Sequence, residues 1–154
     1  MKTRLHALMG FLGTAMMLVF FLSSIIVELA GNEAAVAMVK QMIVYGLFIL
    51  VPAMAATGFS GRAISGMRQG RLIKTKLQRM KFIALNGLLV LLPCALILNS
   101  WAAAGRFDTT FYLLQGVELT AGAINIGLMG LNIRDGLRLS GRLRKKNRLA
   151  TQAQ

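Results

Sequence analysis

Four long apolar stretches, separated by short polar or basic segments, dominate the chain. They run from Leu5 to Glu28, Ala35 to Gly58, Met80 to Trp101 and Thr110 to Ile133. Each is longer than 20 residues, which is enough for an α-helix to cross a hydrocarbon core of roughly 30 Å. The pattern predicts an all-α integral membrane protein with four transmembrane helices. Because short connections make sequential helices neighbours, we expect an antiparallel four-helix bundle that forms one domain over residues 1–148, followed by a flexible tail at 149–154.

The first apolar stretch starts like a secretory signal peptide, because basic residues precede it. A signal h-region has only about 7–15 residues, whereas this run is longer than 20. The best small-residue cleavage motif, Ala35-Val36-Ala37, lies well beyond the end of the run. We therefore expect an uncleaved first helix, with a cleaved signal peptide as the alternative.

The fourth apolar stretch carries a stripe of polar and small residues. Its members are spaced alternately three and four residues apart, and they are Gln115, Glu118, Gly122, Asn125, Met129 and Asn132. This spacing puts all of them on one face of a helix. A carboxylate within a membrane helix costs several kcal/mol and is rarely left unpaired. We therefore expect Glu118 to be buried against a partner or to line a site.

The Lys and Arg residues are distributed very unevenly between the two ends of the predicted helices. Of the 18, all except Lys40 and Arg106 fall before the first helix, between or just inside the second and third, or after the fourth. The positive-inside rule then places both termini in the cytoplasm, and Glu28, Glu33 and Asp108 at the outer face. We expect a multi-pass protein of a bacterial inner membrane.

The formal net charge of +13 is explained by these topology signals. The basic loop 59–79 and the basic tail also suit contact with anionic lipid headgroups. The stretches GRAISGMRQGRLIKTKLQRMK and RDGLRLSGRLRKKNR contain no aromatic residue for base stacking, so nucleic acid is not an expected partner. Within the loop we expect a short amphipathic helix, with Ile64, Met67 and Ile73 among the bases.

Lys40 is the second ionisable residue inside a predicted membrane helix. At 1.5 Å per residue, Lys40 lies about 8 Å and Glu118 about 12 Å from the outer ends of their helices. These matched depths suggest a buried ion pair, with Gln41, Tyr45 and Gln115 supplying hydrogen bonds. Three interpretations are open. The pair only locks two helices together; or Glu118 is a proton- or cation-responsive group governed by Lys40 and burial; or Lys40 snorkels outward and never meets Glu118.

Two other residues that often hold cofactors occur once each. His6, the only histidine, lies near the cytoplasmic end of the first helix, and an interfacial role is the simpler interpretation. Haem bound by His6 with a methionine, or by the His6 residues of two copies, is the alternative. Cys94 is expected to be a buried, inert thiol, and no metal site is expected. Pro52 and Pro93 are expected to kink their helices.

The sequence holds no recognisable catalytic motif, so an enzyme is the least favoured class. The first hypothesis is a homo-oligomeric carrier or ligand-binding protein for a small solute or cation. In it Glu118 is the titrating or cation-binding group, Lys40 its counter-charge, and Gln115, Asn125 and Asn132 provide polar contacts. A homo-oligomer or a larger complex is expected because one bundle of this size has little room for an enclosed cavity. The alternative is a non-catalytic accessory subunit of a larger membrane complex, such as a respiratory one, with the stripe packed against another chain.

Overall fold

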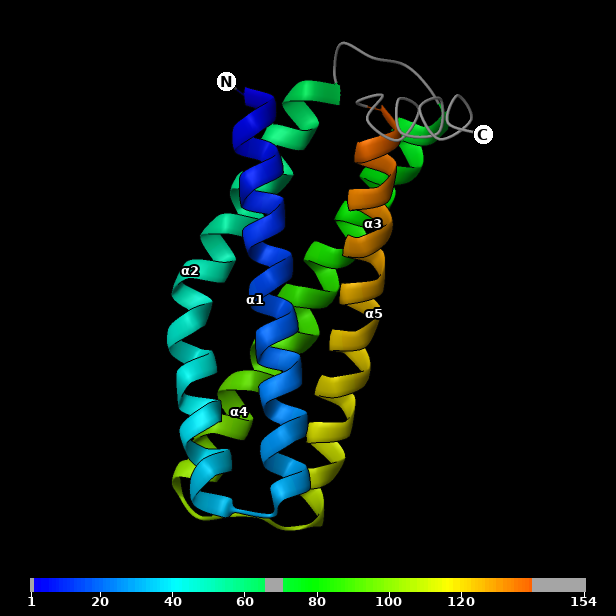
Figure 1. The fold of residues 1–154 in the computed structure, drawn as a ribbon. Helices are drawn as coiled ribbons and strands as arrows, with labels where there is room; N and C mark the ends of the chain where they lie inside the picture. The colour runs from blue at the N-terminus through cyan, green and yellow to red at the C-terminus, as the bar shows by residue number, and fades with distance from the viewer. Residues whose placement is uncertain (1, 66–70, 140–154) are drawn as a thin grey trace, which may run out of the picture.

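The computed structural model describes residues 2–65 and 71–139, and nearly all of them are helical (Figure 1). The elements are α1 (Lys2–Ala30), α2 (Glu33–Ser65), α3 (Arg71–Asn86), a π-helical turn η1 (Gly87–Leu91), α4 (Leu92–Ala103) and α5 (Thr109–Leu139). Within this described part of the chain there is no strand. The predicted tail at 149–154 lies outside the described residues.

Four helical segments are long and apolar enough to cross a membrane. They are His6–Ala30, Glu33–Ala63, Arg71–Ala103 and Thr109–Arg138. The third segment joins α3, η1 and α4 into one continuous helix. An all-helical protein with four membrane-crossing helices, as judged from length and apolarity, is therefore confirmed.

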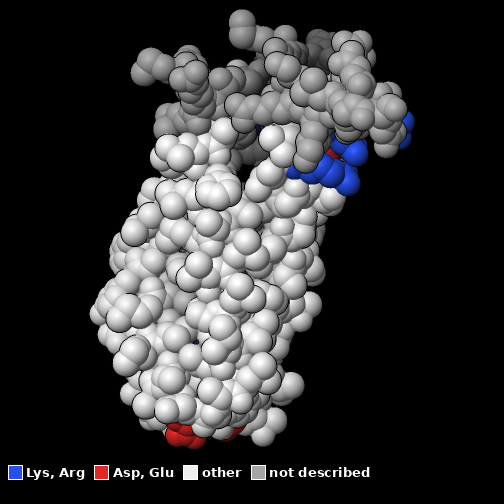
Figure 2. Space-filling view, in the orientation of Figure 1, with Lys and Arg blue, Asp and Glu red and all other residues white. Residues whose placement is uncertain are grey.

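Figure 2 shows the surface that such a protein offers to lipid. The visible face is free of charged side chains over most of its length, with Lys and Arg near one end and Asp and Glu at the other. Many large apolar side chains are exposed along the helices, among them Phe11, Phe48 and Leu113 at 68%, 77% and 68%. In water such a surface would be unfavourable, whereas hydrocarbon solvates it well.

Two short connections lie together at one end of the bundle, opposite the start of α1 and the end of α5 (Figure 1). In the first, Gly31 has φ 66°, a conformation that glycine adopts readily, and the Asn32 side chain accepts a hydrogen bond from Ala35 N at 3.1 Å. In the second, Asp108 Oδ1 accepts one from Phe111 N at 2.9 Å. The Arg106 guanidinium donates to Asp108 Oδ2 at 2.6 Å. These two hydrogen bonds lower the pKa of the Asp108 carboxyl, so it caps α5 in its charged form.

The basic segment between the second and third membrane helices is organised differently from the prediction. No separate amphipathic helix is formed by the described residues of 59–79, because α2 continues to Ser65 and α3 already begins at Arg71. Ile73 belongs to α3, the side chain of Ile64 is not described, and Met67 lies outside the described residues. The physical reason is that an α-helix satisfies its own backbone hydrogen bonds in water as well as in lipid, so apolarity alone does not set its ends.

The two prolines have different effects on the backbone. Pro52 lies inside α2, which continues on both sides of it. Ahead of Pro93 the helix widens into the π-turn η1, and Leu92 N donates to Gly87 O, five residues back. Proline has no N–H and its ring crowds the carbonyl four residues before it, so a wider turn relieves that contact. The expected kink at Pro93 thus takes the form of a π-turn.

Close packing between α1 and α2 depends on a glycine. A Cβ atom built on Gly46 would lie 2.3 Å from Cζ and 2.8 Å from Cε1 of Phe20. Lipid gives helices no hydrophobic reason to associate, so small residues that permit close approach contribute much of the packing energy. Gly46 therefore fixes how closely α1 approaches α2.

Replacing Gly46 by alanine tests this contact. We expect Gly46→Ala to lower the free energy of unfolding by about 1–3 kcal/mol, because the Phe20 ring must leave its place. Gly116→Ala is the matched control, since nothing lies within 4 Å of a Cβ added there. Unfolding in mixed micelles measures both. Equal stability of the two variants would contradict the close contact.

Candidate functional site

The polar stripe of α5 faces the interior of the bundle. Gln115, Asn125 and Met129 are 3%, 3% and 5% exposed, and Gly122 is also buried. Glu118 and Asn132 are partly buried. On the other side of the helix the side chains are apolar and exposed, as expected of a surface in contact with lipid. The predicted face is thus present, and it is covered by this chain itself.

Lys40 of α2 and Glu118 of α5 form an ion pair inside the bundle. Lys40 Nζ donates to Glu118 Oε2 at 2.5 Å. The Lys40 side chain is 0% and the Glu118 side chain 12% exposed. Of the three interpretations of Lys40, the one in which it snorkels outward is therefore wrong. The other oxygen, Glu118 Oε1, has no recorded hydrogen-bond partner among residues 2–65 and 71–139.

Two of the three residues expected to support this pair do not do so. Gln41 and Tyr45 are both exposed, and Gln41 Nε2 donates to Tyr45 Oη at 3.0 Å. They are four residues apart and so share one face of α2, whereas Lys40 points to the buried side. Adjacent residues on a helix differ by about 100° in direction. Sequence proximity to Lys40 was therefore misleading for Gln41 and Tyr45.

The third expected supporter, Gln115, is buried but makes no recorded hydrogen bond. Both its Nε2 and its Oε1 lack a partner within the described ranges, and so does Oδ1 of Asn132. A buried polar atom without a partner costs about 1–3 kcal/mol. Each such atom needs an explanation, for example a water molecule or an ion.

The middle of the stripe is satisfied by α3. Asn86 Nδ2 donates to Asn125 Oδ1 at 2.9 Å and to Ala121 O at 3.0 Å. Asn125 Nδ2 in turn donates to Ile83 O at 3.3 Å. The sequence reasoning did not identify Asn86 as a site residue, although an amide in a membrane helix is itself a signal of a buried partner.

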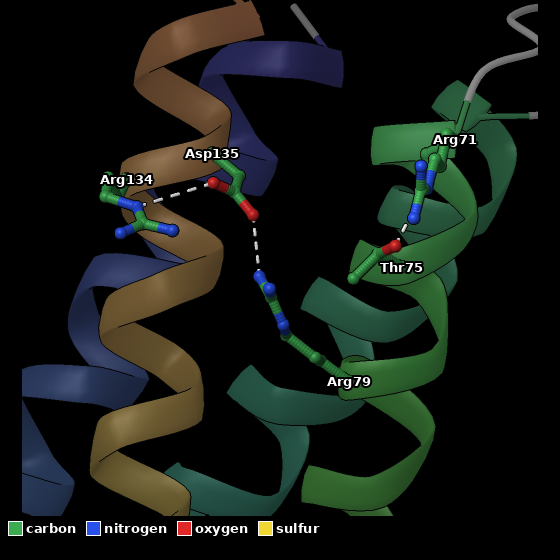
Figure 3. Close-up of polar contacts among 5 residues, drawn as sticks. All are labelled: Arg71, Thr75, Arg79, Arg134 and Asp135. Carbon is green, nitrogen blue, oxygen red and sulfur yellow. Dashed lines mark hydrogen bonds and ion pairs between the residues drawn. The ribbon is translucent and has the colours of Figure 1, made fainter.

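A second buried carboxylate, Asp135, ties the other end of α5 to α3 (Figure 3). Arg79 Nη1 donates to Asp135 Oδ2 at 2.6 Å, and Arg134 Nε lies 3.5 Å from Oδ1, an ion pair without a good hydrogen bond. Lys76 packs over Gly136 and interacts electrostatically with Asp135. Asp135 was not predicted as a site residue, although it lies three residues after Asn132 and so projects from nearly the same face of α5.

Glu28 adds a third charge to the Lys40–Glu118 pair. It projects from α1, it interacts electrostatically with both Lys40 and Glu118, and its Oε1 is buried without a partner in the described structure. Cys94 of α4 is buried, and its thiol interacts electrostatically with Lys40 and Glu118. Glu28 was expected only at the outer face, because it lies at the end of the apolar run. The sequence did not show that its side chain has an oxygen enclosed by the bundle.

His6 acts as a contact between α1 and α2. Its Nδ1 lies 3.1 Å from Thr57 O and 3.0 Å from Ser60 Oγ. A carbonyl oxygen only accepts, so Nδ1 carries the proton and donates. The ring edge also packs against Gly61, as does Met80. This arrangement gives His6 a role in helix pairing.

A cavity of about 190 Å³ lies inside the bundle beside the ion pair. Its wall is almost wholly apolar and includes Phe20, Leu50 and the η1 residues Gly87 and Leu88. The polar residues in the wall are Ser24, Glu118 and Asn125. The cavity is open on one side, so it does not contradict the expectation that a single bundle has little room for an enclosed cavity. Gly87 of η1 and Gly122 of α5 both line it.

The chemistry that this site supports is binding of a polar or charged group in an apolar surrounding. No group of three His, Cys, Asp or Glu side chains capable of holding a metal occurs in the described portion of the chain. Comparisons with protein-family models, curated proteins and solved structures give no significant match. Function is therefore inferred from the geometry of the site alone.

Removing one or both members of the ion pair tests its energetic importance. We expect Lys40→Met alone to destabilise the protein by about 3–5 kcal/mol, because Glu118 then loses its buried partner. The double variant Lys40→Met/Glu118→Met leaves no such charge and should recover most of that loss. The exposed Glu33→Met should cost less than about 1 kcal/mol. If the loss of stability in the double variant equals the sum of the losses in Lys40→Met and Glu118→Met, the pairing is refuted.

Proposed function

We propose that this protein is a carrier or ligand-binding protein for a small solute in a bacterial inner membrane. The bundle is antiparallel, both termini are cytoplasmic, and the end that carries the 31–32 and 104–108 connections faces outward. Support for this orientation comes from the basic residues at the start of α1, around the start of α3, and in the last turns of α5 and beyond it. The basic end then also meets anionic lipid headgroups.

The observation that carries the proposal is the cavity with Glu118 in its wall. Ligand sites are typically apolar spaces with a few polar groups that fix the orientation of the ligand. Here Lys40 Nζ donates a hydrogen bond to Oε2 of Glu118. The other oxygen, Oε1, has no hydrogen-bond partner among the described residues. A suitable solute would have a cationic or hydrogen-bond-donating group to bind Glu118 and a small apolar body to contact the apolar wall.

The size of the cavity limits the part of a solute that it encloses. A 150 Å³ apolar cavity in another protein holds one benzene molecule. A volume of about 190 Å³ therefore suits roughly eight non-hydrogen atoms by the same measure. Larger solutes would extend beyond it toward the lipid.

The wall of the cavity reaches the lipid-facing surface between α2 and α3. Val51 and Ala55 of α2, and Ala84 and Leu88 from the third membrane segment, line the cavity and are also exposed. A membrane-soluble solute therefore has a lateral route to Glu118. The same residues provide positions at which the entrance can be filled by mutation.

The carrier is better supported than the accessory subunit. An accessory role was expected to leave the α5 stripe for another chain, whereas α1, α3 and α4 of the same chain pack against α5, and Lys40 of α2 reaches Glu118. A homo-oligomer remains part of the proposal, with each copy holding its own cavity.

Binding of a size-matched amine tests the proposal. The probes are 4-fluorobenzylamine, which is protonated at neutral pH, and neutral 4-fluorotoluene, each followed by fluorine NMR with the full-length protein in nanodiscs and with empty discs as blank. We expect saturable binding of the amine, at least about tenfold tighter than the neutral probe, because the carboxylate adds a charge-assisted hydrogen bond.

Three variants separate the contributions to binding. Ala84→Phe fills the entrance and should abolish binding of both probes, whereas Ala123→Phe on the exposed face of α5 should not affect it. Lys40→Met/Glu118→Met should remove the preference for the amine and leave the neutral probe bound. Equal binding to wild type and Ala84→Phe, or none beyond that of empty discs, would rule out the cavity as the site.

A further inference from the structure

The ionisable groups near the 31–32 connection do not balance in charge, and Glu28, which is half-buried, forms no ion pair among the described residues. Three helices contribute one charge each, namely Glu28 from α1, Lys40 from α2 and Glu118 from α5, and α4 presents the Cys94 thiol. Two carboxylates and one ammonium leave one negative charge when both carboxyls are ionised. Lys40 Nζ bonds to Glu118 Oε2, and Oε1 of Glu28 is buried without a hydrogen bond in the described structure.

A buried amide next to this group is also unpartnered. Gln115 is 3% exposed, and neither its Oε1 nor its Nε2 has a partner in residues 2–65 or 71–139. It precedes Glu118 by three residues and so projects from the same face of α5, one turn nearer to the end at which Glu28 lies. One acceptor of Glu28 and both polar atoms of Gln115 are thus left unsatisfied at the same end of the bundle.

The other cation of this end is engaged elsewhere. The Arg106 guanidinium donates to Asp108 and stacks on Trp101, with Cζ 4.6 Å from the ring centroid. Its side chain is 47% exposed, so it lies at the surface and does not neutralise Glu28. An enclosed carboxylate oxygen without a partner, such as Oε1 of Glu28, is costly, and a nearby positive charge relieves that cost.

We propose that Glu28, Gln115 and Glu118 form a binding site for one monovalent cation, either a metal ion such as Na⁺ or a proton. The ligands are carboxylate and amide oxygens, which suit a hard cation. Lys40 shares the charge of Glu118, so Glu28 supplies the anionic group that the cation neutralises. If the cation is a proton, Glu28 becomes a donor and Gln115 Oε1 an available acceptor.

This site adjoins the proposed solute site in the cavity, and the two share Glu118. It exists whether or not the cavity binds an amine, because the charge imbalance belongs to the protein itself. In a carrier, a cation at Glu28 and a solute at Glu118 would both interact with the same negative charge. Binding of the cation would therefore change the affinity for the solute.

The test measures thermal unfolding of the full-length protein in nanodiscs by Trp101 fluorescence, without any solute probe. Na⁺ is titrated against choline at constant ionic strength, and the pH is varied from 5 to 9. For a Na⁺ site we expect a saturable rise in melting temperature of about 5 °C or more. For a proton site we expect the melting temperature to fall as the pH rises, because the folded state then releases a proton that it had bound.

Matched carboxylate variants distinguish this site from a general salt effect. Glu28→Gln should remove the Na⁺ or pH response, whereas Glu33→Gln, an exposed carboxylate close to the same connection, should retain it. Gln115→Leu keeps all charges and should weaken the Na⁺ response at least severalfold, which provides a second variant if Glu28→Gln does not fold. A wild type insensitive to both Na⁺ and pH, or an unchanged response in Glu28→Gln, would overturn the proposal. Loss of amine binding with a retained Na⁺ or pH response would refute only the carrier.

Discussion

The requirement that a charge inside a membrane protein be compensated governs how these helices are arranged. Lys40 is completely buried, and the only recorded hydrogen bond of its ammonium group among the described residues joins it to Glu118. Separating α2 from α5 would expose both charges to hydrocarbon, at a cost much larger than that of separating two apolar surfaces. The pair therefore links α2 to α5 through their side chains, although the two helices are not neighbours, and it places a carboxylate beside the cavity.

Helix α5 depends on the same principle along its whole length. It is joined to α2 by Lys40–Glu118, to α3 by Asn86–Asn125, and again to α3 by Arg79–Asp135. Because lipid does not drive helices together, these polar contacts and the close approaches at small residues determine the packing. Two stretches of the stripe are less well satisfied, around Gln115 and at Asn132. The first of these adjoins the unbalanced charges of Glu28, Lys40 and Glu118, and that coincidence is the physical basis for a cation site.

Much of the fold could be predicted from the sequence, because hydrocarbon imposes simple rules. Apolar runs gave the four membrane helices, and alternating three- and four-residue spacing gave the buried face of α5. The similar depths of Lys40 and Glu118 in their helices correctly suggested that the two side chains form an ion pair. Direction around a helix was harder, so Gln41 and Tyr45 were assigned to the wrong side. Glu28 and Asp135 were missed, since an acidic residue at a helix end looks the same in sequence whether it points inward or outward. The cavity was unpredictable because its wall combines residues from every membrane segment, whose side-chain packing the sequence does not show.

The contact between Lys40 and Glu118 is the centre of this account, and solid-state NMR in lipid bilayers measures it most directly. Lysine labelled with ¹⁵N at Nζ and glutamate labelled with ¹³C at Cδ would report the dipolar coupling between the two groups. A nitrogen–oxygen distance of 2.5 Å predicts strong dephasing of one lysine signal, lost in Glu118→Gln. If no lysine nitrogen in the wild type is coupled to a glutamate carboxyl carbon, the buried pair does not exist. The proposed solute site and the proposed cation site, which both depend on that pair, would then be contradicted as well.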